Sequence, residues 1–212
     1  MGLGLVALSA VFISAWWSSP AYKVSAFALP KAAPLVAEAE WQPFYTSRFA
    51  SSDLNEFVHS SSITGLPDGG LMSVWFAGSR EGAADVQVRG ARFDAATGEW
   101  GDELVLATRE STQGSVHKYI RKLGNPVIAL APDQRLWLLY VSVSVGGWAG
   151  SAINAMHSDD LGKTWSAPRQ LVTTPFFNIS TLVRSAPVFH ADGSMGLPVY
   201  HEFLGKFAEY LY

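Results

Sequence analysis

Two kinds of turn recur in this chain at nearly the same interval. One carries an aspartate at positions Asp68, Asp133 and Asp192, which are 65 and 59 residues apart. The other ends on Trp100 and again on Trp165, also 65 residues apart. Two separate markers that repeat at one interval indicate a chain built from successive copies of one structural unit.

Short apolar runs between these turns predict four β-strands in each unit. The predicted strands are 57–66, 71–77, 86–93 and 103–107, then 126–130, 136–143, 151–158 and 169–172, and finally 186–189 and 196–201. No helical period is evident after residue 55. Four strands in each repeat of this length are typical of β-propeller blades. A β-sandwich with coincidental hairpins is the alternative.

Composition narrows the class of protein further. Hydrophobic residues make up 49% of the 212, aromatic residues 13% and charged residues 16%, which suits a β-rich globular protein and excludes disorder. The net charge of −3 gives no basic field for nucleic acid. The chain has no cysteine, which excludes disulfides, thiolate catalysis and cysteine-ligated metals. We expect no metal and no cofactor.

The N-terminus predicts export. Residues 2–17 are uncharged, about as long as a signal-peptide core and shorter than the roughly 20 residues that span a bilayer. Residues 26–28 offer a small-x-small cleavage site, although no basic residue precedes the apolar run. We expect a signal peptide or membrane anchor over 1–28, with a buried helix as the third alternative. A linker with a leading strand is expected over 29–54 and a partial propeller over 55–212. The location would be periplasmic, secreted or membrane-anchored through residues 2–17.

Residues 158–165 match the pattern S-x-D-x-G-x-T-W at every fixed position. These positions are Ser158, Asp160, Gly162, Thr164 and Trp165. The segment resembles the Asp-box (BNR repeat) of the sialidase superfamily, and residues 92–100 resemble a degenerate copy. The resemblance implies an all-β, six-bladed sialidase-like propeller. About two and a half of its blades would lie in this chain and the others outside it. The box is expected to stabilise the fold, since its aspartate caps turn amides and its Trp packs between sheets.

Strand parity predicts which loops gather at the other end of the blades, here called the rim. It should collect the starts of first strands and the loops between second and third strands: 59–61, 80–85, 121–125, 146–150, 184–185 and 201–206. The candidate substrate-binding residues there are His59, Arg80, Arg121, Asn125, Trp148, Arg184 and Lys206. Polar and aromatic groups collected on one side of a fold are typical of a binding site.

The resemblance implies retaining hydrolysis of a terminal sialic acid. Such enzymes use an arginine triad for the sugar carboxylate, a tyrosine nucleophile helped by a glutamate, and an aspartate acid. Arg80 lies where the family has a substrate-side arginine. Asp85 is a candidate acid or base, with a raised pKa if substrate buries it. The alternative is a loop salt bridge from Arg80 to Glu81 or Asp85. The nucleophile is expected outside this chain.

His59 departs from the family pattern, which has an arginine there. A histidine offers no bidentate fork for a carboxylate. Arg121, Lys122 and Arg184 are candidates to rebuild the clamp, unless they are solvated charges at strand ends.

His201 and Glu202 form a further candidate catalytic pair for acid–base chemistry or for orienting a hydroxyl. The glycine-rich loop around Trp148 is expected to present a stacking surface. Residues 178–180 form a glycosylation sequon, which has meaning only in a eukaryotic secretory pathway. The predicted function is a sialidase-like glycoside hydrolase that removes a terminal acidic sugar from a glycan. The alternatives are a non-catalytic carbohydrate-binding propeller and an inactive fragment.

Overall fold

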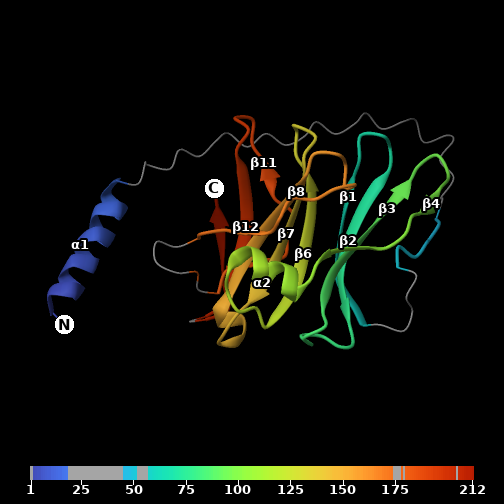
Figure 1. The fold of residues 1–212 in the computed structure, drawn as a ribbon. Helices are drawn as coiled ribbons and strands as arrows, with labels where there is room; N and C mark the ends of the chain where they lie inside the picture. Colours follow the sequence, from blue (N-terminus) through green and yellow to red (C-terminus); the bar gives the residue numbers. More distant parts are fainter. Residues whose placement is uncertain (1, 19–44, 52–56, 174–177, 179, 204) are drawn as a thin grey trace.

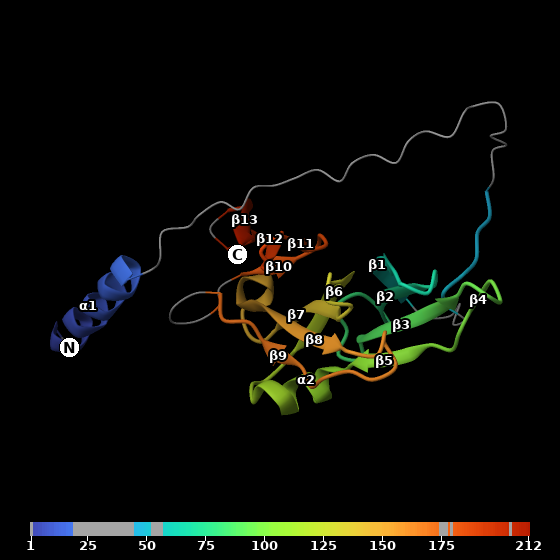
Figure 2. The same ribbon diagram turned by 90° about the horizontal axis from the view of Figure 1, so that it is seen from above.

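The computed structural model describes residues 2–18, 45–51, 57–173, 178, 180–203 and 205–212. The predicted cleavage site at 26–28, most of the predicted linker and part of the sequon lie outside these residues. Helix α1 (Gly2–Ser18) is exposed over residues 4–18 and stands apart from the strands (Figures 1 and 2). Among the helices described, none combines the length and apolar character required to cross a bilayer.

The strands form three antiparallel sheets, which we call blades 1, 2 and 3 (Figure 1). Blade 1 contains β1 (Phe57–Gly65), β2 (Leu71–Gly78), β3 (Gln87–Asp94), β4 (Glu99–Trp100) and β5 (Leu104–Ala107). Blade 2 contains β6 (Lys122–Leu130), β7 (Leu136–Val143), β8 (Ser151–Ser158) and β9 (Arg169–Gln170). Blade 3 contains β10 (Leu182–Val183), β11 (Val188–Phe189), β12 (Met195–His201) and β13 (Phe207–Leu211). The predicted propeller-type arrangement is confirmed.

The first turn of every blade has the same construction, which explains the repeating aspartates. In each, the aspartate Oδ1 accepts a hydrogen bond from the backbone amide two residues later. The donors Gly70, Arg135 and Ser194 lie 3.0, 3.1 and 3.0 Å from Asp68, Asp133 and Asp192. The residue after each aspartate is left-handed, with φ of 82° at Gly69, 69° at Gln134 and 84° at Gly193.

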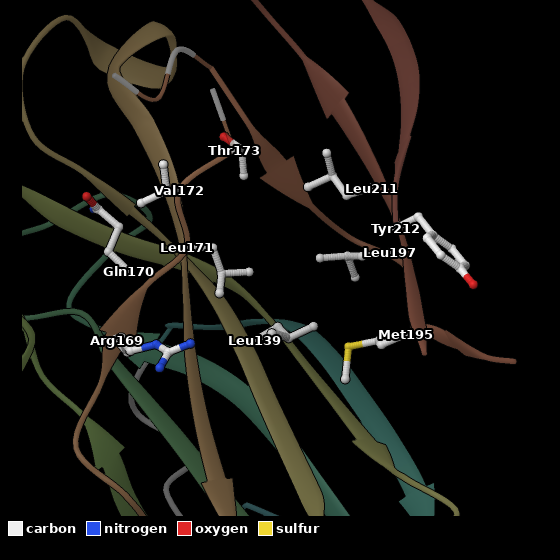
Figure 3. Close-up of a pocket in the computed structure, with 10 residues that line it drawn as sticks. All are labelled: Leu139, Arg169, Gln170, Leu171, Val172, Thr173, Met195, Leu197, Leu211 and Tyr212. Carbon is white, nitrogen blue, oxygen red and sulfur yellow. The ribbon is translucent and has the colours of Figure 1, made fainter. Parts of the chain in front are cut away.

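Strand β7 separates two hydrophobic cores because successive side chains of a strand point to opposite faces. Its Leu138 and Tyr140 pack with Met72 of β2 in the core between blades 1 and 2. Its Leu139 and Val141 pack in the core between blades 2 and 3. This second core is incompletely filled. A cleft of about 760 Å³ lies between the segment that begins with β9 and the strands β12 and β13 (Figure 3).

Helix α2 (Arg109–Val116) contradicts the prediction that no helix follows residue 55. The helix is eight residues long and mostly polar, so it has no apolar stripe for a periodicity search to find. Its N-terminus carries a capping box in which Thr108 and Ser111 bond each other's backbone. Its buried Thr112 hydroxyl lies 2.8 Å from the Tyr140 hydroxyl, which ties the helix to blade 2.

Several strand boundaries also differ from prediction. Strand β6 begins four residues early, at Lys122, because Pro126 lies in a bulge between Gly124 and Val127 rather than at a strand start. Strand β9 ends at Gln170, two residues short of prediction. The first strand of blade 3 is divided into β10 and β11, and β13 continues the blade beyond the predicted hairpin.

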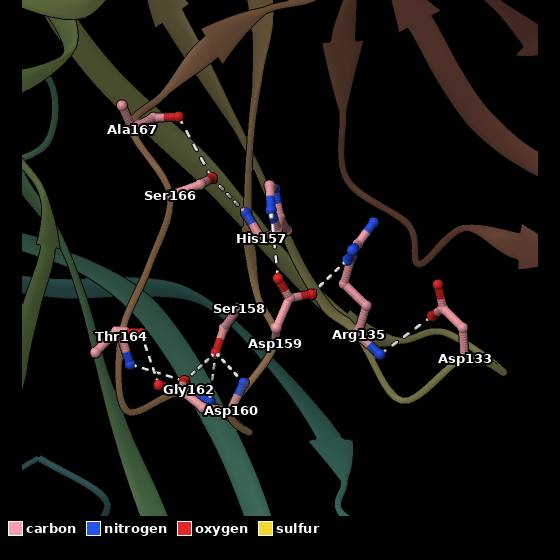
Figure 4. A network of polar contacts seen from close by, with 10 residues as sticks. All are labelled: Asp133, Arg135, His157, Ser158, Asp159, Asp160, Gly162, Thr164, Ser166 and Ala167. Carbon is pink, nitrogen blue, oxygen red and sulfur yellow. Dashed lines mark hydrogen bonds and ion pairs between the residues drawn. The ribbon is translucent and has the colours of Figure 1, made fainter.

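The Asp-box closes the turn after β8 through a compact hydrogen-bond network (Figure 4). Ser158 Oγ donates to Asp160 Oδ1 at 2.7 Å and accepts from the Gly162 amide at 2.8 Å. Thr164 donates its hydroxyl to Asp160 Oδ2 at 2.6 Å and its amide to Oδ1 at 2.8 Å. These bonds, those from Thr164 foremost, lower the pKa of Asp160 to about 2. Trp165 donates its indole N–H to the Gly162 carbonyl at 3.1 Å.

The box also joins two blades, as expected of a structural element. Gly162 has a φ of 93°, and a Cβ added there would lie 3.4 Å from Met72 Sδ in blade 1. Trp165 packs against the core between blades 1 and 2. In the degenerate copy, Asp94 Oδ1 accepts the Ala96 amide at 2.7 Å.

Replacing Tyr140 with Phe should lower the free energy of unfolding by about 1–2 kcal/mol, because the buried Thr112 hydroxyl loses its partner. Chemical denaturation of the 212-residue chain measures this. The double variant Tyr140→Phe/Thr112→Val, which removes both polar groups, should regain part of the loss. A single variant as stable as the wild type would contradict the assignment.

The stabilising effect of Asp160 should depend on pH. The folded-state pKa lies below the ordinary value of about 3.9, so the contribution is present above that value and is lost as pH falls toward 2. Wild type should melt at a higher temperature than Asp160→Asn at pH 7, and the gap should shrink between pH 5 and pH 2. Asp102→Asn, at an exposed position, is the control. A gap that is constant with pH would refute the network's role.

Candidate functional site

The structure separates the Asp-box end of the blades from the rim. In Figure 1 the turns after β6 and β8 lie at the upper end, and the loops after β2 and β7 lie at the lower end. This follows from antiparallel pairing of consecutive strands, as parity predicted. The cleft between blades 2 and 3 contains none of the candidate rim residues, so we treat it as part of the interblade packing.

The loop after β2 meets blade 2 at Lys122. A Cβ added at Gly82 would lie 3.6 Å from Lys122 Cδ, so the backbone of blade 1 runs against the lysine stem. The Lys122 ammonium in turn lies 3.9 Å from the centre of the Trp148 ring. Three candidate segments from two blades are therefore in contact through one lysine.

The contacts continue from blade 2 to blade 3. The Ser180 amide donates to the Ala149 carbonyl at 3.0 Å, directly after Trp148. The Ser180 hydroxyl accepts the Glu202 amide at 2.7 Å. Asn125 Nδ2 donates to the Tyr200 hydroxyl at 3.2 Å, which joins β6 to β12. The structure thus brings the predicted rim segments of blades 2 and 3 together.

The inner strands of blades 1 and 2 share a feature that sequence reasoning missed. Ser60 in β1 has a φ of 55° and Asn125 in β6 a φ of 46°, and each lies at a bulge eight residues before a turn aspartate. Arg184 has the same spacing in blade 3, where β10 ends and β11 has not begun. The eight-residue spacing to the turn aspartate is the feature of the sequence that could have indicated these positions. Bulges re-aim side chains, and these three positions repeat once in each blade.

The rim cations are unpaired. Arg80, Arg121, Arg184 and Lys206 are exposed and Lys122 is half-buried, and across the described residues none of the five lies within 4.0 Å of a carboxylate oxygen. Elsewhere Arg48, Arg89, Arg92, Arg109 and Arg135 each form an ion pair. Among the described residues, Lys118, Lys163 and Arg169 also form no ion pair. The rim therefore presents cationic groups that form no ion pair with a described carboxylate.

His59 is exposed near the rim end of β1. Its ring packs edge-on against Phe76 at 5.5 Å and lies 5.8 Å from Phe57. The position thus supplies an imidazole beside aromatic rings rather than a guanidinium.

Asp85 is held by hydrogen bonds within its own loop. Its carboxylate accepts the Ser79 amide and the Ser79 hydroxyl, both at 3.0 Å. These bonds, the backbone one foremost, lower its pKa in an exposed loop. The alternative salt bridge from Arg80 is not formed in this part of the structure either. Asp85 closes the loop after β2.

His201 pairs with a residue other than the one predicted. Its Nε2 lies 2.6 Å from Glu209 Oε2 on the neighbouring strand, and its ring stacks on Phe207 at 4.7 Å. Glu202 is half-buried, and its carboxylate makes no hydrogen bond to the described residues. Of the three catalytic candidates, only Glu202 keeps its functional group available. No group of His, Asp or Glu side chains suited to a metal occurs in the described ranges.

Solved structures share this fold at low sequence identity. A Dyadobacter fermentans protein of unknown function has a TM-score of 0.56 and 9% identity, over 74% of this chain and 51% of that one. A family 117 glycoside hydrolase from Zobellia galactanivorans has a TM-score of 0.54 and 12% identity, over 77% of this chain and 54% of its own. The Hadza microbial sialidase has a TM-score of 0.53 and 14% identity, over 68% of this chain and 32% of its own. The chain thus spans about half, or less, of the length of these proteins.

The neighbours show the fold and leave the chemistry open. They include sialidases, an endo-arabinase and a polysaccharide lyase, so the fold is shared by several kinds of carbohydrate-active enzyme. No curated protein matches the sequence significantly. The sequence model of the BNR repeat-like domain matches residues 69–212, which is more than half of the chain. The chain therefore belongs to the BNR repeat-like domain family.

Proposed function

We propose that this chain is part of an extracytoplasmic sialidase-like glycoside hydrolase that removes a terminal acidic sugar from a glycan, in the manner of an exo-α-sialidase. The observation that carries the proposal is the set of unpaired cations at the rim. The apolar helix α1 supports export or anchoring. Protease accessibility of a C-terminal tag in intact cells would test the location.

The rim cations suit an acidic ligand for electrostatic reasons. A carboxylate binds a guanidinium through two parallel charge-assisted hydrogen bonds, and Arg80, Arg121 and Arg184 retain all their side-chain donors in the described structure. These residues come from three different blades, so a sugar bound among them would contact the whole rim. His59 does not contribute such a fork, so we assign the bidentate contact to the arginines.

Glu202 is the residue we assign to proton transfer. Its backbone amide donates to the Ser180 hydroxyl, and its carboxylate makes no hydrogen bond to any residue that the structure describes. A positioned carboxylate can give a proton to a leaving oxygen or take one from water. Asp85 stabilises the loop that carries Arg80, which makes it a positioning residue.

A non-catalytic carbohydrate-binding propeller is the second candidate. It is favoured by one observation: Asp85 and His201 are both bound within the protein. An inactive fragment is the third. Turnover by the full-length protein separates the first candidate from the other two, and binding to a glycan array separates the second from the third.

Glu202→Gln should lower kcat for a fluorogenic sialoside by about 10²–10⁴-fold in the full-length protein, because the carboxylate that moves the proton is gone. KM should change little, since an amide of the same shape remains. Asp85→Asn is the comparison and should lower the melting temperature through its loop. Glycan binding by a wild type without turnover would favour the binding module. Full activity of Glu202→Gln would remove Glu202 from the mechanism.

Arg121→Gln and Arg184→Gln should each raise KM about tenfold, because each removes a charge-assisted contact to the sugar carboxylate. Lys163→Gln is the matched control. It removes the same charge from an unpaired cation at the Asp-box end and should leave KM within about twofold. Equal effects from all three variants would indicate a general field rather than a rim site. Higher salt should weaken binding in wild type more than in the arginine variants.

A further inference from the structure

Lys122 occupies a constrained place where blades 1 and 2 meet at the rim. It begins β6, opposite Val143 of β7, and is half-buried. The loop of blade 1 approaches it at Gly82, which has a φ of 69°. A side chain held from two blades has less freedom than a lysine on an open surface, so its ammonium is presented in a defined position.

Trp148 fixes the other side of the ammonium. Its ring centre lies 3.9 Å from Lys122 Nζ, within the range of a cation–π contact. A Cβ added at Gly124 would lie 3.3 Å from the Trp148 ring, so the ring rests on the β6 backbone. The left-handed glycines Gly146 and Gly147, with φ of 83° and 65°, turn the loop that delivers this tryptophan.

The positive charge of Lys122 has no carboxylate partner among the described residues. Burial lowers the pKa of Lys122, as does the neighbouring Arg121, and Glu81 acts in the opposite direction without forming an ion pair. A π face attracts a cation but does not neutralise it. A partly desolvated cation gains more from an anionic partner than a fully hydrated one.

We propose that Lys122, held over Trp148, binds the carboxylate of the acidic sugar together with the rim arginines and strengthens the preference for charged over neutral sugars. The proposal rests on the rim being the sugar site. It adds a specificity residue that is not an arginine, contributed from the boundary between two blades.

The test uses calorimetry on the full-length protein to compare binding of N-acetylneuraminic acid with binding of its neutral methyl ester. Wild type should prefer the acid, since charge-assisted contacts from Lys122 and the rim arginines distinguish the two ligands, and Lys122 should account for about tenfold of that preference. Lys122→Met keeps the apolar stem over Trp148 and removes the charge. It should weaken binding of the acid about tenfold and leave the ester within about twofold. Lys163→Met, which loses the same charge at the opposite end, should behave as wild type.

A second readout reports on the pair directly. The acid should change the tryptophan emission of wild type, and this change should be absent in Trp148→Phe and in Lys122→Met. Equal weakening of acid and ester in Lys122→Met would show a merely structural tie between blades and overturn the proposal. So would a wild type that binds neither ligand. Selective binding of the acid without hydrolysis of sialosides would refute the proposed hydrolase and leave this inference standing.

Discussion

The structure depends on strand β7 being buried on both faces. Even-numbered side chains such as Leu138 and Tyr140 fill the core toward blade 1, and odd-numbered ones such as Leu139 and Val141 fill the core toward blade 3. A one-residue slip in register would exchange the two sets and disrupt both cores. The relative placement of all three blades, and with it the rim, therefore rests on the alternation along one strand.

The antiparallel order of the strands then divides stability from recognition. Turn aspartates and the Asp-box occupy one end, where Asp160 and Ser158 bond their own turn and Gly162 packs on the neighbouring blade. The loops at the rim are joined by fewer bonds, such as those of Ser180, and carry the unpaired charges. This division agrees with the general placement of binding residues on loops that a rigid scaffold supports.

The structure shows which of the candidate side chains at the rim already have partners within the protein. Of the three predicted catalytic residues, Asp85 is bonded to Ser79 and His201 to Glu209, whereas the carboxylate of Glu202 makes no hydrogen bond to the described residues. The relatives of this fold include hydrolases and a lyase, so the fold does not select the reaction. The side chains at the rim must do so. The proposal of an acidic glycan rests on their cationic character.

The sequence by itself determined the repeat, the propeller class, the Asp-box and the bounds of β7 and β8, because turn chemistry and period-two alternation are local patterns. Helix α2 could not be predicted because a short polar helix has no apolar stripe. Tertiary contacts hold it, such as the one from Thr112 to Tyr140 and the packing of Val116 on the core. The bulges at Ser60 and Asn125 and the partner of His201 were decided only by tertiary structure. They arise from register between strands and from packing between blades, which residues distant in the chain set together.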